Sequence, residues 1–228
     1  MRDQRDSAIN LMDQHKFSDA IPLFTQLLES NRHDWSLHYM LGQCYRFTNS
    51  YPDAVQSLDK AASLKPDDAR IYLALGIAHQ LNGDVESAVK ALERAVELEP
   101  SFFSAYNSLG LTYKISGDYQ RALDWYFRAA NGIISAAMEL VHKEPDKHLR
   151  DKVIDGELTR AMDPHTFEEI REHLRSDPSY AIIKNNIGVC YMELGDKDSA
   201  REQFQESILT IPEGYDYREP YRNLESLG

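Results

Sequence analysis

The chain reads ARIYLALGIAHQLNGDVESAVKALERAVELEPSF from residue 69 to residue 102. In its first half, selected residues recur three or four positions apart, as one face of an α-helix requires. These residues are Tyr72, Leu75, Gly76 and His79. Gly83 and Asp84 suit a turn, because glycine takes the left-handed conformation after a helix and aspartate caps the next one. The second half repeats the helical spacing with Ala88, Leu92 and Ala95 until Pro100, which cannot extend a helix. The stretch therefore predicts a helical hairpin.

A small residue recurs every 34 positions along the chain, and an alanine follows each one twelve residues later. The pairs are Ala8 and Ala20, Gly42 and Ala54, Gly76 and Ala88, and Gly110 and Ala122. After a gap of 78 residues, which is two periods plus ten, the pattern resumes with Gly188 and Ala200. Glycine inside a helix costs roughly 0.8–1 kcal/mol relative to alanine. The repeated glycines therefore predict a contact that tolerates no side chain, where two backbones touch.

The other units carry matching residues at the same places. Examples are Leu41, Tyr45, Leu58 and Pro66, then Tyr106, Tyr113, Gly117 and Tyr126, then Ile187, Tyr191, Gly195 and Phe204. This pattern resembles the tetratricopeptide repeat, which also has a period of about 34 residues. Residues 35–68, 69–102, 103–136 and 181–214 match closely, and residues 1–34 match less well. The resemblance implies an all-α, right-handed superhelical solenoid of antiparallel helix pairs, with five recognisable repeats, one divergent repeat and a C-terminal capping helix.

The 34-residue period is interrupted after residue 136. Counting back from Ala181 places a divergent repeat at residues 147–180, in which Ile154 and Thr166 replace the small pair. The ten extra residues either extend the preceding helix to about residue 146 or follow a helix stop at Asn131-Gly132; we favour the long helix. The larger side chains at the close contact should push the two helices of the divergent hairpin apart and bend the stack of hairpins. We therefore expect an N-terminal module, residues 1–146, and a C-terminal module, residues 147–228, in which residues 215–228 form the cap.

Composition excludes several classes of protein. The net charge of −12 argues against a nucleic-acid partner, because phosphate binding needs a basic surface. No run approaches the roughly 20 apolar residues of a membrane-spanning helix, so we expect no membrane insertion. The polar start lacks a signal peptide, so we expect a cytoplasmic location unless an upstream segment is missing. The two cysteines, Cys44 and Cys190, both follow a repeat glycine by two residues and are predicted to be small packing residues.

Catalytic chemistry has little support in the sequence. It contains no glycine-rich phosphate loop, no His-Glu-x-x-His, no Cys-x-x-Cys and no nucleophile elbow, so we predict neither an enzyme nor a cofactor. A weak metal candidate is His165, Glu169 and His173, which are spaced by four on one predicted helix. A metal site would need further ligands in fixed geometry. We therefore interpret this stripe as a solvated face with one partly buried histidine and predict no metal.

The resemblance also implies which side chains face the hollow of the solenoid: the second, fifth, ninth, twelfth and thirteenth residues of each first helix. Our candidate contact residues are Arg5, Tyr39, Gln43, Arg46, Phe47, Arg70, Leu73, Ile77, Leu81, Asn107, Leu111 and Lys114. Over these positions in the first four units, basic residues outnumber acidic ones five to one, and apolar residues lie between them. This mixture favours a protein partner whose bound segment is apolar with acidic residues beside it. An adjoining element of the same chain, such as residues 137–180, is the alternative occupant of this face.

One known activity of the family can be compared directly. Repeat domains that hold the acidic C-terminus of heat-shock chaperones resemble one another in a clamp of lysine, arginine and asparagine. At the corresponding places this chain has Arg5, Ile9, Met40, Arg70 and Ala74. The clamp is therefore not present in that register, and we do not expect binding of chaperone tails.

Three functions stay open. The leading prediction is a non-catalytic scaffold or adaptor that binds a partner segment in the concave groove. The second is an assembly subunit that forms homo-oligomers through convex faces and hairpin edges. The third, a metal-dependent regulator built on residues 147–180, has the least support.

Overall fold

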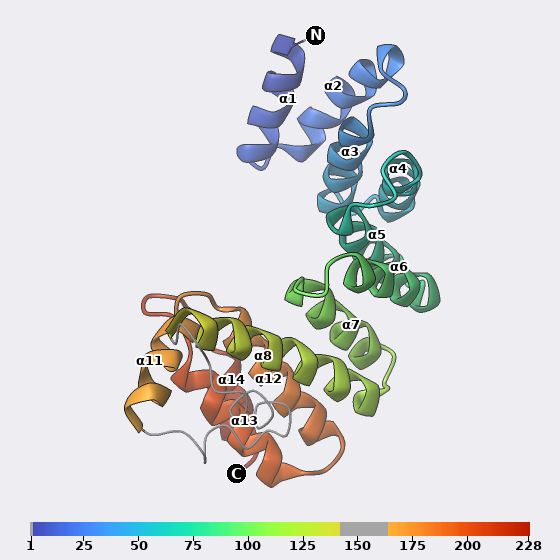
Figure 1. Cartoon of the computed structure of the whole chain (residues 1–228). Coiled ribbons are helices and arrows are strands. Elements are labelled where there is room, and N and C mark those ends of the chain that lie inside the picture. The colour runs from blue at the N-terminus through green and yellow to red at the C-terminus, as the bar shows by residue number, and fades with distance from the viewer. Residues whose placement is uncertain (1, 142–163) are drawn as a thin grey trace. The chain divides into compact units, whose positions relative to one another are not determined.

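The structure is a computed structural model that describes residues 2–141 and 164–228, and every regular element in these two ranges is an α-helix (Figure 1). The helices are α1 (Arg2–Asp13), α2 (Phe17–Ser30), α3 (Trp35–Phe47), α4 (Tyr51–Leu64), α5 (Ala69–Leu81), α6 (Val85–Leu98), α7 (Phe103–Ile115), α8 (Tyr119–Val141), α11 (Pro164–Leu174), α12 (Ser179–Glu193), α13 (Lys197–Leu209) and α14 (Glu219–Ser226). The all-helical fold class is as predicted. None of the described helices is both long and apolar enough to cross a membrane.

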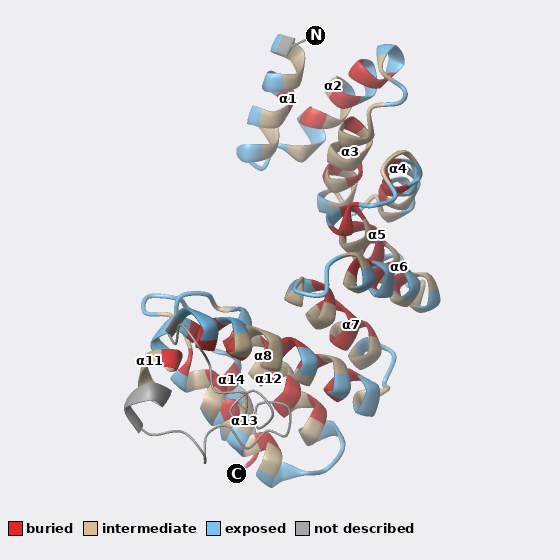
Figure 2. Ribbon diagram, in the orientation of Figure 1, coloured by how far each residue is buried: buried red, intermediate tan, exposed pale blue. Residues whose placement is uncertain are grey.

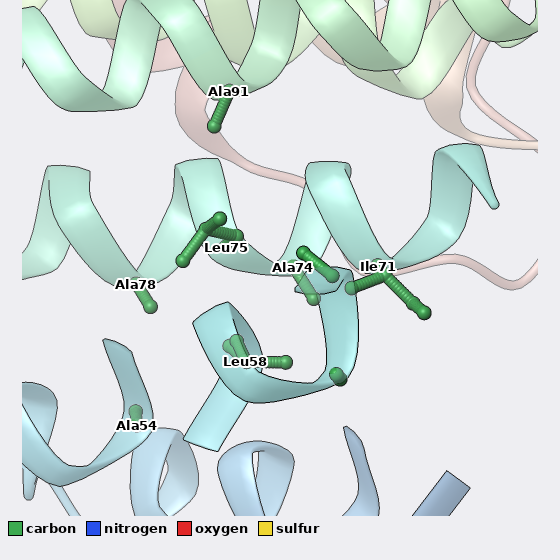
Figure 3. Packing of buried hydrophobic residues seen from close by; sticks show 9 residues of the cluster. Ala54, Leu58, Ile71, Ala74, Leu75, Ala78 and Ala91 are labelled. Atoms are coloured by element: carbon green, nitrogen blue, oxygen red, sulfur yellow. The ribbon is translucent and has the colours of Figure 1, made fainter. Parts of the chain in front are cut away.

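The helices group into two compact units, Met1–Ser108 and Leu109–Gly228. In the first unit, α1 packs on α2, α3 on α4 and α5 on α6, and α2 also packs on α3 and α4 on α5. Figure 2 shows buried residues where the helices face one another. Figure 3 shows one such place, where Ala54 and Leu58 of α4 lie near Ile71, Ala74 and Leu75 of α5.

The turns inside the hairpins follow the predicted glycine-aspartate chemistry. Gly83, Gly117 and Gly195 have φ angles of +82°, +81° and +83°, the left-handed conformation that glycine adopts without strain. Asp84 then caps α6 by accepting a hydrogen bond from the Ser87 backbone N–H at 3.1 Å. At the same place in the preceding repeat, Asn49 adopts a φ of +61°, which asparagine tolerates better than most residues.

The predicted close contact exists, but the expectation of two touching backbones needs correction. A Cβ placed on Gly76 would lie 2.5 Å from Leu92 Cγ and 3.2 Å from the Ala88 backbone oxygen. A Cβ on Gly110 would lie 2.6 Å from the Tyr126 ring, and one on Gly188 would lie 2.5 Å from the Phe204 ring. The space that glycine leaves is therefore filled mainly by a large side chain of the second helix, with the backbone beyond it.

The long second helix is confirmed, because α8 continues through Asn131 and Gly132 to Val141. The rest of its expected extension, the boundary at residue 146 and Ile154 of the divergent repeat lie outside the described residues. A feature that the sequence did not predict is that α12 packs directly on α8, as α11 also does. The hairpin of α12 and α13 is therefore stacked on α8 in the same manner as consecutive repeats of the first unit.

The predicted cap is present as α14, which packs against α13 and α12. Pro220 and Leu227 are buried, and Leu224 packs against the cluster formed by Ala200, Phe204 and Leu227. A solenoid end exposes the apolar side of its last hairpin unless another element covers it. Helix α14 supplies that cover.

Candidate functional site

Ten of the predicted contact residues lie in the first unit, on its first helices. They are Arg5 on α1, Tyr39, Gln43, Arg46 and Phe47 on α3, Arg70, Leu73, Ile77 and Leu81 on α5, and Asn107 on α7. We call these residues the first-helix face. None of them is fully buried, so all present some surface to solvent. Leu111 and Lys114 belong to the second unit and are described with it.

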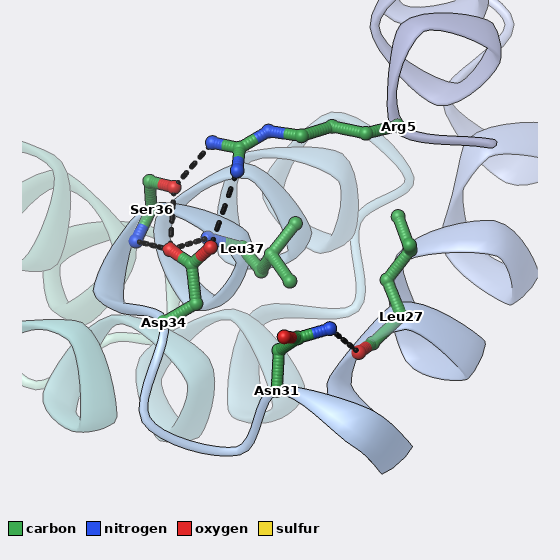
Figure 4. A network of polar contacts seen from close by, with 6 residues as sticks. All are labelled: Arg5, Leu27, Asn31, Asp34, Ser36 and Leu37. Carbon is green, nitrogen blue, oxygen red and sulfur yellow. Dashed lines mark hydrogen bonds and ion pairs between the residues drawn. The ribbon is translucent and has the colours of Figure 1, made fainter. Parts of the chain in front are cut away.

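Arg5 is held by the start of α3 (Figure 4). Its guanidinium donates to Asp34 Oδ2 at 3.2 Å and to Ser36 Oγ at 2.6 Å. Asp34 also caps α3 by accepting from the Ser36 and Leu37 backbone N–H groups. Partial burial works to raise the pKa of Asp34, but the hydrogen bonds from Ser36 and the charge of Arg5 hold it below its usual value. Arg5 therefore already has a carboxylate partner in its own chain.

Arg70 has the same kind of partner one repeat later. Its Nε and Nη2 atoms donate to the two carboxylate oxygens of Asp68 at 2.9 Å and 2.6 Å, a bidentate pair. Asp68 caps α5, and Lys65 lies 3.6 Å from the same carboxylate. The hydrogen bond from Arg70 is the main reason that the pKa of Asp68 lies below its usual value. Arg70 therefore links the first turn of α5 to Asp68, the residue that caps this helix.

Arg46 differs from both. Its Nε donates to Gln43 Oε1 at 2.9 Å, and Gln43 in turn donates to the Tyr39 hydroxyl at 3.0 Å. None of the carboxylates that the structure describes forms an ion pair with Arg46. Burial lowers the pKa of this guanidinium, which means that its charge has lost part of its hydration. Arg46 is thus a partly desolvated cation whose neighbours on α3 are neutral.

Large apolar side chains accompany Arg46. Its guanidinium carbon lies 4.1 Å from the centroid of the Phe47 ring, and Phe17 stacks on Phe47 with centroids 4.4 Å apart. Phe47 is nevertheless 51% exposed, and Leu81, the corresponding residue of the next repeat, is 43% exposed. Leu73 packs partly against the cluster of Ala69, Ala95 and Ala105. The end of the first-helix face at Phe47 and Leu81 therefore carries apolar surface beside an arginine.

Asn107 contributes an unusual polar group. Its side-chain oxygen Oδ1 is buried, and no described residue donates a hydrogen bond to it. A buried acceptor without a donor is unfavourable by about 1–3 kcal/mol. A donor supplied from outside the described chain would remove this cost.

In the second unit, the chain itself occupies much of the corresponding surface. Lys114 donates from Nζ to Asn186 Oδ1 at 2.7 Å, and burial lowers its pKa, while Leu111 is half-buried. On α12, Asn185 accepts from Asn223 Nδ2 at 2.9 Å, and Val189 and Met192 pack against the same buried cluster as Leu224. For this last repeat, α14 of the same chain packs against α12 and α13. Residues 142–163, most of the alternative occupant expected from the sequence, lie outside the described residues.

The metal candidate lies on α11, as the sequence predicted. Its described part does not converge on a centre: His173 Nδ1 lies 3.2 Å from the Glu169 backbone oxygen, and the His165 side chain is outside what the structure describes. Among the side chains that are described, no group of three or more His, Cys, Asp or Glu residues could hold a metal ion.

The cysteine prediction is confirmed. Cys44 and Cys190 are free and fully buried, and burial raises the pKa of each thiol to about 11. Both therefore act as small packing residues.

The sequence pattern did not indicate the two aspartates that neutralise Arg5 and Arg70. Asp34 and Asp68 come just before a helix and so lie outside the five positions that were counted as lining. An aspartate directly before a helix that has serine or arginine at its second residue was the available signal. The excess of basic charge on this face is consequently smaller than the residue count indicated.

The comparisons with known proteins agree with this architecture. A family profile described as tetratricopeptide repeat matches residues 5–69 and 73–136, and a second profile with the same description matches residues 181–213. No curated protein matches the chain.

Several solved structures have a similar fold. MamA is 21% identical, with a TM-score of 0.64 and coverage of 89% of this chain and 93% of its own. MamA 41-end from Desulfovibrio magneticus RS-1 is 15% identical, with a TM-score of 0.67 and coverage of 92% and 93%. YrrB, described as a TPR protein with an unusual peptide-binding site, is 17% identical, with a TM-score of 0.60 and coverage of 96% and 88%. At these identities the likeness concerns the fold alone. Together with the matched profiles, it leads to one conclusion: the chain belongs to the tetratricopeptide repeat family.

Proposed function

We propose that the protein is a non-catalytic scaffold or adaptor that binds a segment of another protein on the first-helix face. Membership of a family built from stacked helix pairs supports this class of function, because such stacks present long surfaces of exposed side chains. The description of YrrB as having a peptide-binding site is consistent with it. The bound segment is apolar and has an acidic residue beside its apolar side chains.

The observation that carries this proposal is the environment of Arg46. Removing a cation from water is costly unless it is paired, and here the described partners are the neutral side chains of Gln43 and Phe47. A carboxylate from a partner would complete the hydrogen bonding of the guanidinium. The exposed surfaces of Phe47 and Leu81 would then hold the neighbouring apolar side chains of that partner.

Arg5 and Arg70 are less available to a partner than Arg46. Arg5 and Arg70 are already paired with Asp34 and Asp68, so a ligand carboxylate would have to compete with a carboxylate of the chain. Arg70 therefore serves as a matched control for Arg46, since it lies on the same face and carries the same charge.

The test is a selection from a random peptide library on the immobilised protein, repeated with Arg46→Gln and Arg70→Gln. We expect wild type and Arg70→Gln to enrich peptides with an acidic residue next to apolar ones, and Arg46→Gln to lose the acidic preference. Circular dichroism first checks that both variants keep the wild-type helicity. Identical enrichment by all three proteins would contradict the proposed role of Arg46.

Self-assembly and the cytoplasmic location stay predictions. Sedimentation over a range of protein concentrations distinguishes self-assembly from the proposed function: a monomer leaves the first-helix face free for another protein, whereas rods or rings favour an assembly subunit.

A further inference from the structure

A second surface lies within the second unit, between α14 and the connection that joins α13 to α14. It is a pocket with a volume of about 870 Å³. Part of its lining comes from this connection, residues 210–218, and the rest comes from Tyr221, Arg222 and Glu225 on α14. The three helix residues are three or four positions apart and so share one face of α14. This α14 pocket has no residue in common with the first-helix face.

Three tyrosines give the α14 pocket aromatic walls. Tyr215 is 45% exposed and Tyr221 is 46% exposed, so the chain itself leaves much of both side chains uncovered. Tyr217 is partly buried, and its ring centroid lies 6.2 Å from that of Tyr215. Burial raises the pKa of the Tyr217 hydroxyl to about 12, so this side chain is uncharged at neutral pH. The pocket therefore offers aromatic ring surface to a ligand.

The charged residues of the lining balance one another. Two are basic, Arg218 and Arg222, and two are acidic, Asp216 and Glu225. Arg218 pairs with Asp216 inside the connection, where Nε donates to Oδ1 at 2.7 Å. Arg222 and Glu225 are exposed, and neither forms an ion pair with a residue that the structure describes. The lining therefore has no net charge, which argues against a strongly anionic or cationic ligand.

The uncommitted polar groups of the pocket are mainly hydrogen-bond donors. The hydroxyls of Tyr215 and Tyr221 form no hydrogen bond with a residue in the described part of the chain. Arg222 adds a guanidinium, which has several N–H donors and no acceptor. Glu225 supplies the one carboxylate of the lining that is not paired within the described chain. A complementary ligand therefore offers many acceptors and few donors.

We propose that the α14 pocket binds a proline-rich segment of a partner protein in the polyproline II conformation. Such a segment uses none of its carbonyl oxygens in internal hydrogen bonds, and its prolines have no N–H group. Its rings pack on aromatic side chains, as proline-rich segments do in other aromatic-lined grooves. The segment thus matches a neutral, aromatic lining that is rich in donors, and Tyr215, Tyr221 and Arg222 donate to its carbonyls.

A partner helix fits this pocket less well. Its carbonyl oxygens are already used in internal hydrogen bonds, so they would leave the donors of the pocket without acceptors. In addition, α14 has 8 residues and is only about 12 Å long at 1.5 Å per residue, which gives a second helix little to pack along.

The experiment measures binding of fluorescently labelled decaproline to the intact protein by fluorescence anisotropy. Decaproline forms a polyproline II helix, and blocked termini leave it uncharged. A glycine-serine peptide of equal length is the flexible, uncharged reference. We expect decaproline to bind at least about tenfold more tightly than this reference. Equal affinities would overturn the proposal. Tighter binding of a third peptide, with glutamate at alternate positions, would show that the pocket is an anion site and would also overturn it.

Two variants and a matched control locate the binding. Tyr215→Ala, Tyr221→Ala removes the exposed rings and should weaken decaproline binding at least about tenfold. Tyr215→Phe, Tyr221→Phe keeps the rings but loses the hydroxyl donors and should weaken it about fivefold. The control Leu194→Ala changes a residue of the second unit that is 48% exposed but outside the pocket, and should bind as wild type does.

Circular dichroism first checks that all three proteins keep the wild-type helicity and melting temperature. Undiminished binding by the alanine variant, or an equal loss in Leu194→Ala, would overturn the assignment to the α14 pocket. Undiminished binding by the phenylalanine variant would show that the hydroxyls do not donate to the segment, and that part of the proposal would be wrong.

Two further outcomes are decisive. Arg46→Gln should leave decaproline binding unchanged, because Arg46 belongs to the first unit, so failure of this proposal and failure of the proposed function are distinguishable. If the protein dimerises in sedimentation and Tyr215→Ala, Tyr221→Ala prevents dimerisation, the occupant is a second copy of the chain, and the proposal of a proline-rich partner segment is wrong.

Discussion

At the scale of single residues, the repeat depends on a small residue and a large residue sixteen positions later. The large residues are Phe24, Leu58, Leu92, Tyr126 and Phe204, all fully buried. The period predicted that a close contact exists. It did not predict the partner, because helix spacing shows which residues share a face but not which side chain of the opposite helix fills the space.

Gly76→Ala tests this contact. The change should gain up to about 1 kcal/mol in helix propensity but lose about 1–3 kcal/mol through overpacking, because the new Cβ would lie 2.5 Å from Leu92 Cγ. We therefore expect a net decrease in the free energy of unfolding, measured by urea denaturation. In a Leu92→Ala background the same change should cost much less stability, since only the 3.2 Å contact with the Ala88 backbone oxygen remains. Stabilisation of the wild-type background by Gly76→Ala would contradict the account.

Asp68 gives the fold a dependence on pH. Its pKa is lowered in the folded protein, chiefly by the hydrogen bond from Arg70, so its contribution to stability is present above the unfolded pKa of about 3.9. That contribution is lost as the pH falls through the lower folded pKa. We expect Asp68→Asn to reduce stability at pH 7 by about 1–2 kcal/mol, and the difference from wild type to shrink below about pH 4. Asp67→Asn, at an exposed neighbouring position, is the control for chemical denaturation between pH 7 and pH 3.

At the scale of secondary-structure elements, the unusual one is α8. Its helical pattern was readable beyond the end of the repeat, so its continuation past residue 136 could be predicted. Its partners could not, because the residues that follow it interrupt the 34-residue period that identifies neighbours. The structure shows that both α11 and α12 pack on it.

Met138 and Leu140 test whether the end of α8 is a packing element. Met138 is 1% exposed and Leu140 is 74% exposed, although both lie beyond the repeat boundary at residue 136. Met138→Ala should lower the free energy of unfolding by about 2–5 kcal/mol, and Leu140→Ala should change it by less than about 0.5 kcal/mol. Equal, small effects of the two substitutions in denaturant titrations would show that this segment contributes no packing.

Helix α14 is the second element with a testable role. Removal of residues 219–228 should expose Val189 and Met192 and thereby increase binding of the dye ANS and self-association in sedimentation. Tyr221→Ala alters an exposed residue of the same helix and should change neither property. A truncated protein that stays monomeric and binds no additional dye would show that α14 is not needed as a cap.

At the scale of the whole molecule, periodicity predicted the helical hairpins and their turns, and the resemblance to the tetratricopeptide repeat implied the fold and the first-helix positions. The sequence did not predict which side chains at those positions already have a partner in the chain, because the partners lie outside the five positions of each first helix. Asp34 and Asp68 neutralise two arginines from helix caps. Arg46 is left as the cation without a carboxylate partner among the described residues of the first-helix face.

The most direct measurement is a double-mutant cycle between Arg46 and the acidic residue of a selected peptide. Affinities are measured by isothermal titration calorimetry for wild type and Arg46→Gln, each with the acidic peptide and with its amide counterpart, and Arg70→Gln is the matched control protein. We expect a coupling of about 1 kcal/mol or more for Arg46 and none for Arg70. No coupling at Arg46, or the same coupling at Arg70, would contradict the claim that Arg46 receives the carboxylate of the partner.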